Sequence, residues 1–257
     1  TPSNSSAASD VYKRQKISNV EGFMGRAFMV TATDTGVGKT VVVGGLSIGF
    51  RRMELEPGVF KPAESGVVGE PLDGLFLKKC SGTRRPLGDV VPYTLTEPLA
   101  PAVAAEREGI EIDLGLIGGK FREWVGNHPI TLVEGAGGLL VPITGTFTYA
   151  DLARWLDLPV LVVARPSLGT INHTLLTVRV ARAVGLRVLG VVISGYPEEP
   201  GVAEETNPAV IERMGHVRVL ALIPQIPGLS TENGELGDLE AYPWEELAGE
   251  VWELVNE

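Results

Sequence analysis

Short apolar runs recur along the chain from residue 28 onward. They occupy residues 28–32, 59–61, 130–134, 160–164, 188–194 and 217–223. These runs are rich in Val, Ile and Leu and alternate little, which is typical of strands buried on both faces. The intervening residues 41–50, 99–107, 114–125, 149–156, 170–184 and 244–255 are predicted to be helices. This order predicts an α/β fold, a doubly wound and mostly parallel sheet with helices on both faces.

The N-terminal stretch does not fit this pattern. Residues 1–10 are rich in Ser, Ala and Asn, and a polar stretch follows without the apolar core of a secretory signal. We therefore expect residues 1–26 to be an extraneous or disordered leader. Neither a repeat nor a long linker divides the remainder, so residues 27–257 are expected to form a single domain.

A phosphate-binding loop is predicted between the first strand and the first helix. Residues 31–40 read Thr-Ala-Thr-Asp-Thr-Gly-Val-Gly-Lys-Thr. Between a strand and a helix, such a loop presents N–H groups to an anion at the helix N-terminus. The strict pattern has glycine where this chain has Thr33, so the alternative is a fortuitous Gly-Lys-Thr. The P-loop prediction assigns nucleotide contacts to Gly36, Val37, Gly38, Lys39, Thr40 and Val41.

Within that loop, two side chains have specific chemistry. Lys39 is placed to reach the β- and γ-phosphates of a nucleotide, and the Thr40 hydroxyl is placed to ligate Mg²⁺. The domain is therefore predicted to be of the P-loop NTPase type.

Charged residues also follow or close later apolar runs, where ligands of parallel sheets bind. Lys61 ends the second run and could stabilise phosphate charge, although a solvated surface lysine is an equal alternative. Asp73 is a candidate metal ligand that, by itself, could equally be a solvated or helix-capping residue.

The third run closes with an acidic residue and a glycine-rich turn. Glu134 ends the strand, and an acidic residue beside a P-loop is the usual second anchor for Mg²⁺. Glycines let a backbone approach a ligand closely, although they could serve turn geometry alone. The turn residues predicted to contact the nucleotide are Gly135, Ala136 and Gly137.

Composition and charge narrow the functional classes. The net charge of −10 argues against nonspecific nucleic-acid binding, because a polyanion would be repelled. The apolar runs are all shorter than a membrane span. A single cysteine, Cys80, excludes an intrachain disulfide and fits a reducing cytoplasm. We therefore expect a cytoplasmic protein that binds neither nucleic acid nor membranes.

Taken together, these motifs resemble the dethiobiotin synthetases, ATP-dependent cyclo-ligases of biotin synthesis. The family's loop, roughly G-T-D-T-x-V-G-K-T, matches residues 32–40, with Ala32 in place of the leading glycine. The likeness continues in order through residues 61–66, 92–101, 133–138, 148–152 and 168–177.

Two alternatives remain. One is a nucleotide-switched interaction module, since relatives of this P-loop group partition DNA or position division proteins. Those relatives usually carry a second lysine near the loop start, where this chain has Thr33 and Asp34. The other is a synthetase-like domain that has lost catalysis, which the retention of Lys39, Lys61, Asp73 and Glu134 argues against.

The resemblance implies a concrete reaction. A carbamate of 7,8-diaminononanoate, formed with CO₂, is phosphorylated by MgATP to a carbamic–phosphoric mixed anhydride and then closed to dethiobiotin. The resemblance also implies roles for individual residues and a homodimer, because the turn that binds the substrate's distant carboxylate comes from a second subunit. The implied residues are Lys39, Lys61 and Thr35 for catalysis, Thr40, Asp73 and Glu134 for Mg²⁺, Ser65 for the diamine end, and Leu168, Gly169, Thr170 and Asn172 for the carboxylate.

The chain departs from the family pattern where the base is bound. Better-known members carry Asn-Asp where this chain has Ser194 and Gly195, and many have an acidic residue where it has Gly36. Loss of the paired amide and carboxylate predicts weak discrimination among nucleotide bases, so nucleoside triphosphates other than ATP are also expected to serve. The backbone that could still contact a base edge is that of Pro227, Gly228 and Leu229.

Overall fold

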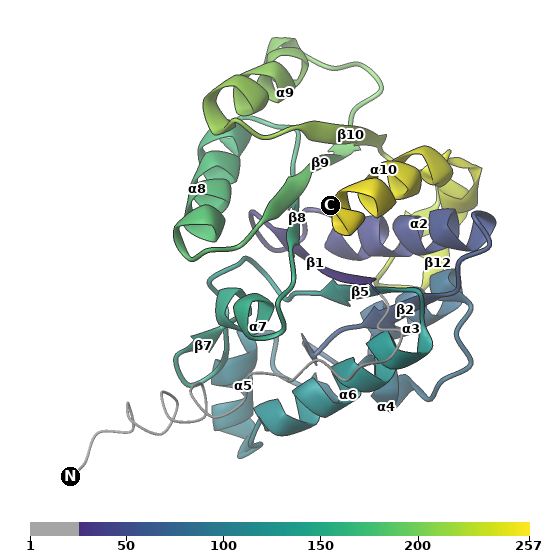
Figure 1. Ribbon diagram of the computed structural model, residues 1–257, viewed down its shortest axis with the longest axis vertical. Coiled ribbons are helices and arrows are strands. Elements are labelled where there is room, and N and C mark those ends of the chain that lie inside the picture. Colours follow the sequence, from purple (N-terminus) through teal and green to yellow (C-terminus); the bar gives the residue numbers. More distant parts are fainter. Residues whose placement is uncertain (1–25) are drawn as a thin grey trace.

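The computed structural model describes residues 26–257 and contains a central sheet of six strands (Figure 1). The leader predicted over residues 1–26 lies outside the described residues, except for Arg26, which begins β1. The strands are β1 (Arg26–Ala32), β2 (Pro57–Phe60), β5 (Ile130–Glu134), β8 (Val160–Ala164), β9 (Val188–Tyr196) and β10 (Val219–Pro224).

These strands lie in the order β10-β9-β8-β1-β5-β2, and every neighbouring pair is parallel. The predicted parallel α/β sheet is thus confirmed. β5 and β8 are buried along their full length on the two sides of β1, as the unbroken apolar runs in the sequence require.

The helices divide between the two faces according to the direction of each connection. The step from β1 to β2 runs toward one edge of the sheet, and every later step runs the other way. Because parallel crossovers are right-handed, α2 (Lys39–Arg52) lies on one face, and α6 (Leu114–Asn127), α7 (Tyr149–Trp155), α8 (Thr170–Ala183) and α9 (Val202–Gly215) lie on the other. α10 (Trp244–Asn256) returns to pack on α2 (Figure 1).

This reversal creates a crevice at the carboxyl ends of the central strands. The chain leaves β1 toward one face and leaves the adjacent β5 toward the other. Such switch points are where open α/β sheets bind ligands. The predicted phosphate loop follows β1 and the turn at Gly135 follows β5, so the topology brings both to this crevice.

Three short sheets lie outside the main sheet. β3 (Ala63–Ser65) pairs in parallel with β4 (Tyr93–Leu95), β6 (Pro142–Thr144) pairs with β7 (Phe147–Thr148), and β11 (Leu229–Ser230) pairs with β12 (Glu235–Leu236). The β3–β4 pair fixes residues 92–101 beside the segment that follows Lys61.

Several elements differ from the sequence prediction. Helix 99–107 is α5 (Pro101–Glu108), and β9 continues through Ser194 and Gly195 to Tyr196. The sequence reading did not predict α9, which contains Pro208, or α3 (Leu72–Ser81), α4 (Leu87–Val90) and the 3₁₀ helix η1 (Gly237–Ala241).

The small residues on one side of α2 are explained by its packing on α10. A Cβ atom at Gly45 would lie 2.1 Å from the Trp244 ring, and one at Gly49 would lie 2.5 Å from the Trp244 carbonyl oxygen. Trp244 is fully buried and its indole N–H donates to the carbonyl of Leu239 at 2.8 Å. The glycines therefore let a large aromatic ring sit directly on the helix backbone.

Among the described residues, none of the helices combines the length and the hydropathy needed to cross a bilayer.

We predict that Gly45→Ala lowers the free energy of unfolding by about 1–3 kcal/mol, because overpacking at Trp244 outweighs the higher helix propensity of alanine. Chemical denaturation measures the change. Gly249→Ala in α10 is the matched control, since no atom lies within 4 Å of its added Cβ. It is expected to raise stability by up to about 1 kcal/mol. Equal effects of the two substitutions would contradict the packing explanation.

Candidate active site

The predicted phosphate loop has the geometry of an anion-binding helix start. Gly36 and Gly38 have φ angles of +71° and +97°, in the left-handed region that favours glycine. Gly38 immediately precedes α2, which begins at Lys39. Lys39 and Thr40 are buried at this helix start, where free N–H groups and the helix dipole attract anions.

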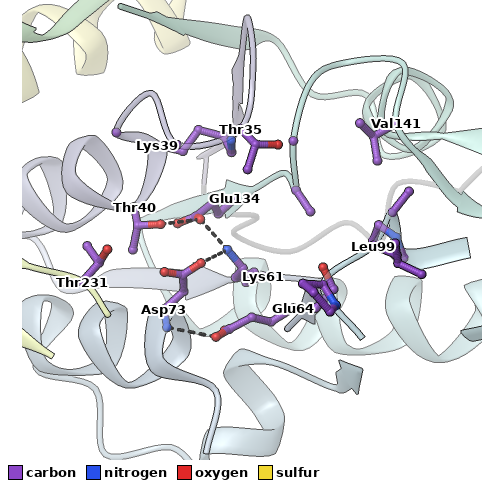
Figure 2. Close-up of a pocket in the computed structure, with 18 of the residues that line it drawn as sticks. Thr35, Lys39, Thr40, Lys61, Glu64, Asp73, Leu99, Glu134, Val141 and Thr231 are labelled. Carbon is purple, nitrogen blue, oxygen red and sulfur yellow. Dashed lines mark hydrogen bonds and ion pairs between the residues drawn. The ribbon is translucent and has the colours of Figure 1, made fainter. Parts of the chain in front are cut away.

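A cluster of ion pairs, buried except for the partly exposed Asp73, lies directly below this loop (Figure 2). Lys61 Nζ donates to Asp73 Oδ2 and to Glu134 Oε1, each at 2.6 Å. Thr40 Oγ1 donates to the same Glu134 oxygen at 2.8 Å. One lysine thus joins the loop after β2, the first turn of α3 and the end of β5, and all three site residues predicted to bind Mg²⁺ meet around it.

Burial governs the electrostatics of the cluster. Glu134 is 0% exposed, and this desolvation raises its pKa in spite of the opposing charge of Lys61. For Lys61, burial alone would lower the pKa, but the carboxylates of Glu134 and Asp73 outweigh it and raise the pKa. Burial lowers the pKa of Lys39 to about 8. The carboxylates therefore stabilise the charged form of Lys61, whereas burial disfavours the charged forms of Glu134 and Lys39.

The cluster forms the charged end of a cavity of about 700 Å³. At its other end, the wall is apolar and comes from the segment after β4 and from the turn after β5. The residues of this apolar wall are Pro98, Leu99, Ala100, Pro101 and Val141. A cavity with cations at one end and an apolar wall at the other suits a ligand that joins phosphate or carboxylate groups to an aliphatic portion.

The oxygen atoms at the charged end fit Mg²⁺. Glu134 Oε2 is buried and has no hydrogen-bond partner among the described residues. It lies on a side chain that already contacts the Thr40 hydroxyl. The described part of the chain has no group of three or more His, Cys, Asp or Glu able to hold a metal. Mg²⁺ typically takes only one or two carboxylates and completes its shell with phosphate oxygens and water.

Most residues predicted from the sequence line the cavity. They are Thr35, Gly36, Gly38, Lys39, Thr40, Val41, Lys61, Ser65, Asp73, Glu134, Ala136 and Gly137. Val37 instead packs in the hydrophobic core, and Gly135 lies against the ring of Tyr149. The Val37 side chain is thus turned into the core and Gly135 has no side chain, so only backbone groups of these two residues are left for ligand contacts.

The residues predicted to contact the base do not line this cavity. Ser194 lies behind the phosphate loop, so close that a Cβ atom at Gly38 would be 2.4 Å from its hydroxyl oxygen. Gly195, Pro227, Gly228 and Leu229 also lie outside the cavity lining. The only cavity-lining residue of the region after β10 is Thr231, beyond strand β11.

The turn predicted to bind a carboxylate is also separate from the cavity. Leu168 is 87% exposed, Gly169 has a φ of +92°, and α8 begins at Thr170. Asn207 in α9 fixes the start of this turn by donating to the carbonyl of Pro166 at 2.7 Å. None of the turn residues Leu168, Gly169, Thr170 and Asn172 lines the cavity.

Seven residues that line the cavity were not predicted from the sequence to belong to the site. They are Glu64, Pro98, Leu99, Ala100, Pro101, Val141 and Thr231. Glu64 and residues 98–101 lie in segments that resemble the family, so their position was the available signal. Thr231 and Val141 have no such signal, because a hairpin and a turn far along the chain bring them to the cavity.

Comparison with known proteins agrees with this architecture. The family model described as an AAA domain matches residues 26–233. Two solved structures have a similar fold. A chain of the MinC:MinD cell division protein complex of Aquifex aeolicus matches with a TM-score of 0.56 and 16% identity, covering 91% of this chain and 96% of that chain. The cell division ATPase MinD of Pyrococcus furiosus matches with a TM-score of 0.53 and 19% identity, covering 90% of this chain and 100% of that chain. The predicted P-loop NTPase fold is confirmed.

Curated relatives are much more similar in sequence. The ATP-dependent dethiobiotin synthetase BioD of Anaeromyxobacter dehalogenans (strain 2CP-C) is 45% identical over 217 residues, which cover 84% of this chain and 97% of the relative. The protein of the same name from Bacillus velezensis is 41% identical over 210 residues, covering 81% and 90%. This chain therefore belongs to the family of ATP-dependent dethiobiotin synthetases.

Proposed function

We propose that this protein is an ATP- and Mg²⁺-dependent cyclo-ligase that closes 7,8-diaminononanoate and CO₂ into dethiobiotin. The observation that carries the proposal is the cluster of buried Lys61, Glu134 and Thr40 with the partly exposed Asp73, directly below the phosphate loop. Family membership supplies the substrate. We place the reaction in the cytoplasm, in line with the single, buried thiol of Cys80.

Each step of the proposed reaction places negative charge on oxygen atoms that cations can stabilise. One substrate amine adds to CO₂ and loses a proton, giving a carbamate, whose oxygen attacks the γ-phosphorus of ATP and displaces ADP. The second amine then attacks the carbamate carbon, and phosphate leaves with the carbamate oxygen. Negative charge gathers on oxygens in these steps, so Lys39, Lys61 and the loop N–H groups provide the main stabilisation. Thr40, Asp73 and Glu134 would hold Mg²⁺, which would supply neutralisation of phosphate charge.

The other cavity residues serve binding and orientation. Thr35 and Ser65 line the cavity with hydroxyl groups that can donate to the carbamate region and to the diamine end. The apolar wall at residues 98–101 accommodates the aliphatic chain and excludes water from the reactive anhydride.

Phosphate release is expected to require the diamine, bicarbonate and MgATP together, because the anhydride cannot form without a carbamate. A coupled phosphate assay that omits each component in turn measures this requirement. ATP hydrolysis at an undiminished rate without diamine or bicarbonate would instead identify a nucleotide switch.

Lys61→Ala serves as the variant in the same assay. We expect kcat to fall by about 10²–10³-fold with a much smaller change in the KM for ATP, because the charge acts on oxygens that gain charge in the transition state. Circular dichroism verifies folding, since the variant leaves Asp73 and Glu134 without their ion pair. A change confined to KM would make Lys61 a residue that binds the ground state.

A homodimer with shared active sites is also expected, because the turn at residues 168–172 lies outside the cavity of its own subunit. Lys39→Ala and Asn172→Ala chains should each be inactive alone and regain activity after mixing and subunit exchange. The heterodimer then contains one site with both side chains intact. Sedimentation establishes the oligomeric state, and failure to regain activity from two exchanging inactive dimers would contradict shared sites.

Base discrimination is expected to be weak. Ser194 contacts the phosphate loop and offers a single hydroxyl, whereas a paired amide and carboxylate would reject the wrong base. The ratio of kcat/KM for ATP, CTP, GTP and UTP should therefore stay below about a hundredfold, which corresponds to about 2.7 kcal/mol. A strong preference for ATP or for any other single base would contradict this expectation.

A further inference from the structure

Helix α3, which carries Asp73, starts without a cap of its own. The N-cap position is Pro71, which offers no side-chain hydrogen bond. The first N–H groups of a helix nevertheless need acceptors when they are buried. Glu64 provides them from the preceding strand, β3: Oε1 accepts from the N–H of Asp73 and Oε2 accepts from that of Gly74, both at 3.0 Å.

The same short segment therefore holds Asp73 from two sides (Figure 2). Lys61 contacts the Asp73 carboxylate at 2.6 Å, and Glu64, three residues later in β3, contacts the Asp73 amide. An aspartate has only two side-chain torsions, so fixing its backbone and one carboxylate oxygen leaves little freedom for the other oxygen.

Close packing also restrains the first turn of α3. A Cβ atom at Gly74 would lie 2.5 Å from Val91 Cγ2, so this turn packs tightly against residues next to α4. Glu64 itself is only 7% exposed, and burial raises its pKa to about 7. A charged side chain at such a site is costly unless its hydrogen bonds are made, which they are here.

We propose that Glu64 is a positioning residue that holds the Asp73 carboxylate in the orientation required to bind the Mg²⁺ of the nucleotide complex. The inference rests on the metal role of Asp73 in the proposed function. In this proposal Glu64 acts on the metal indirectly, by holding the ligand Asp73. Loss of a residue that orients a metal ligand commonly lowers metal affinity about 10–100-fold. Helix capping alone would affect stability but leave metal affinity unchanged.

The test measures Mn²⁺ binding to the ADP complex by electron paramagnetic resonance at pH 8. Glu64→Ala is expected to weaken Mn²⁺ binding by about 10–100-fold. The Mn²⁺ affinity of Glu64→Gln should lie between those of Glu64→Ala and the wild type. The amide oxygen can accept a hydrogen bond from one of the two backbone N–H groups, but the NH₂ group would face the other. The affinity for ADP in EDTA should stay within about twofold of wild type, since Glu64 does not contact the phosphate loop.

Two matched controls separate positioning from general effects. Thr148→Ala removes the N-cap of α7, whose capping box with Asp151 is a comparable helix-start contact. It should lower the melting temperature and leave Mn²⁺ binding unchanged. Glu70→Gln removes a nearby negative charge from an exposed residue outside the large cavity, and it should also leave Mn²⁺ binding within about twofold of wild type.

The outcomes are distinct. If Glu64→Ala weakens Mn²⁺ binding no more than Thr148→Ala does, Glu64 is only a cap and the proposal is overturned. Retention of full Mn²⁺ affinity in Asp73→Asn also overturns it, because Asp73 is then no ligand. If Glu64→Ala does not fold, the Glu64→Gln measurement decides. Loss of Mn²⁺ affinity in a protein whose wild type makes no dethiobiotin would overturn the proposed reaction while supporting the role of Glu64.

Discussion

The site depends on the compensation of buried charge around Lys61. Glu134 is completely buried, and Lys61 is nearly so, yet each carries an ionisable group. A lone charge at such a depth is very unfavourable, and removing one partner of a buried pair typically costs about 3–5 kcal/mol. Lys61 therefore ties the ends of β2 and β5 to the start of α3, and the adjacency of β2 and β5 in the sheet is what brings these charges together.

The same arrangement prepares the site for a charged ligand. Lys61 contacts the two carboxylates that we propose as Mg²⁺ ligands, so the ammonium and the metal compete for the same oxygens. An ammonium that gives up carboxylate partners can meet phosphate or carbamate oxygens without leaving the cavity. Lys39, whose pKa burial lowers to about 8, likewise gains from an anionic ligand that restores the stability of its charged form. Lys61 is thus placed to exchange its carboxylate partners for the oxygens of an anionic ligand, and Lys39 is placed to gain such oxygens as partners.

The sequence was sufficient for the parts of this site that depend on local signals. All six strands of the main sheet follow from apolar runs, and Lys39, Lys61 and Glu134 follow from strand ends and the loop motif. Helix α3 was not predicted because the residue that caps it, Glu64, lies in another element, and Pro71 at the N-cap position gives no local sign of a helix start. Thr231 escaped because only the folded hairpin β11–β12 brings it to the cavity. Contacts between different elements that leave no local signal in the sequence therefore set the limit of prediction.

The variant phosphate loop shows which features of the motif are physical requirements. Gly36 and Gly38 both have positive φ angles, and Gly38 also leaves no room for a Cβ atom beside Ser194. Thr33, which stands where the strict pattern has glycine, lies in a bend just after β1, has no positive φ and donates its N–H to the carbonyl of Val163. A side chain at residue 33 therefore costs no backbone strain, whereas one at residue 38 would. The glycines that this loop retains are those that its backbone conformation requires.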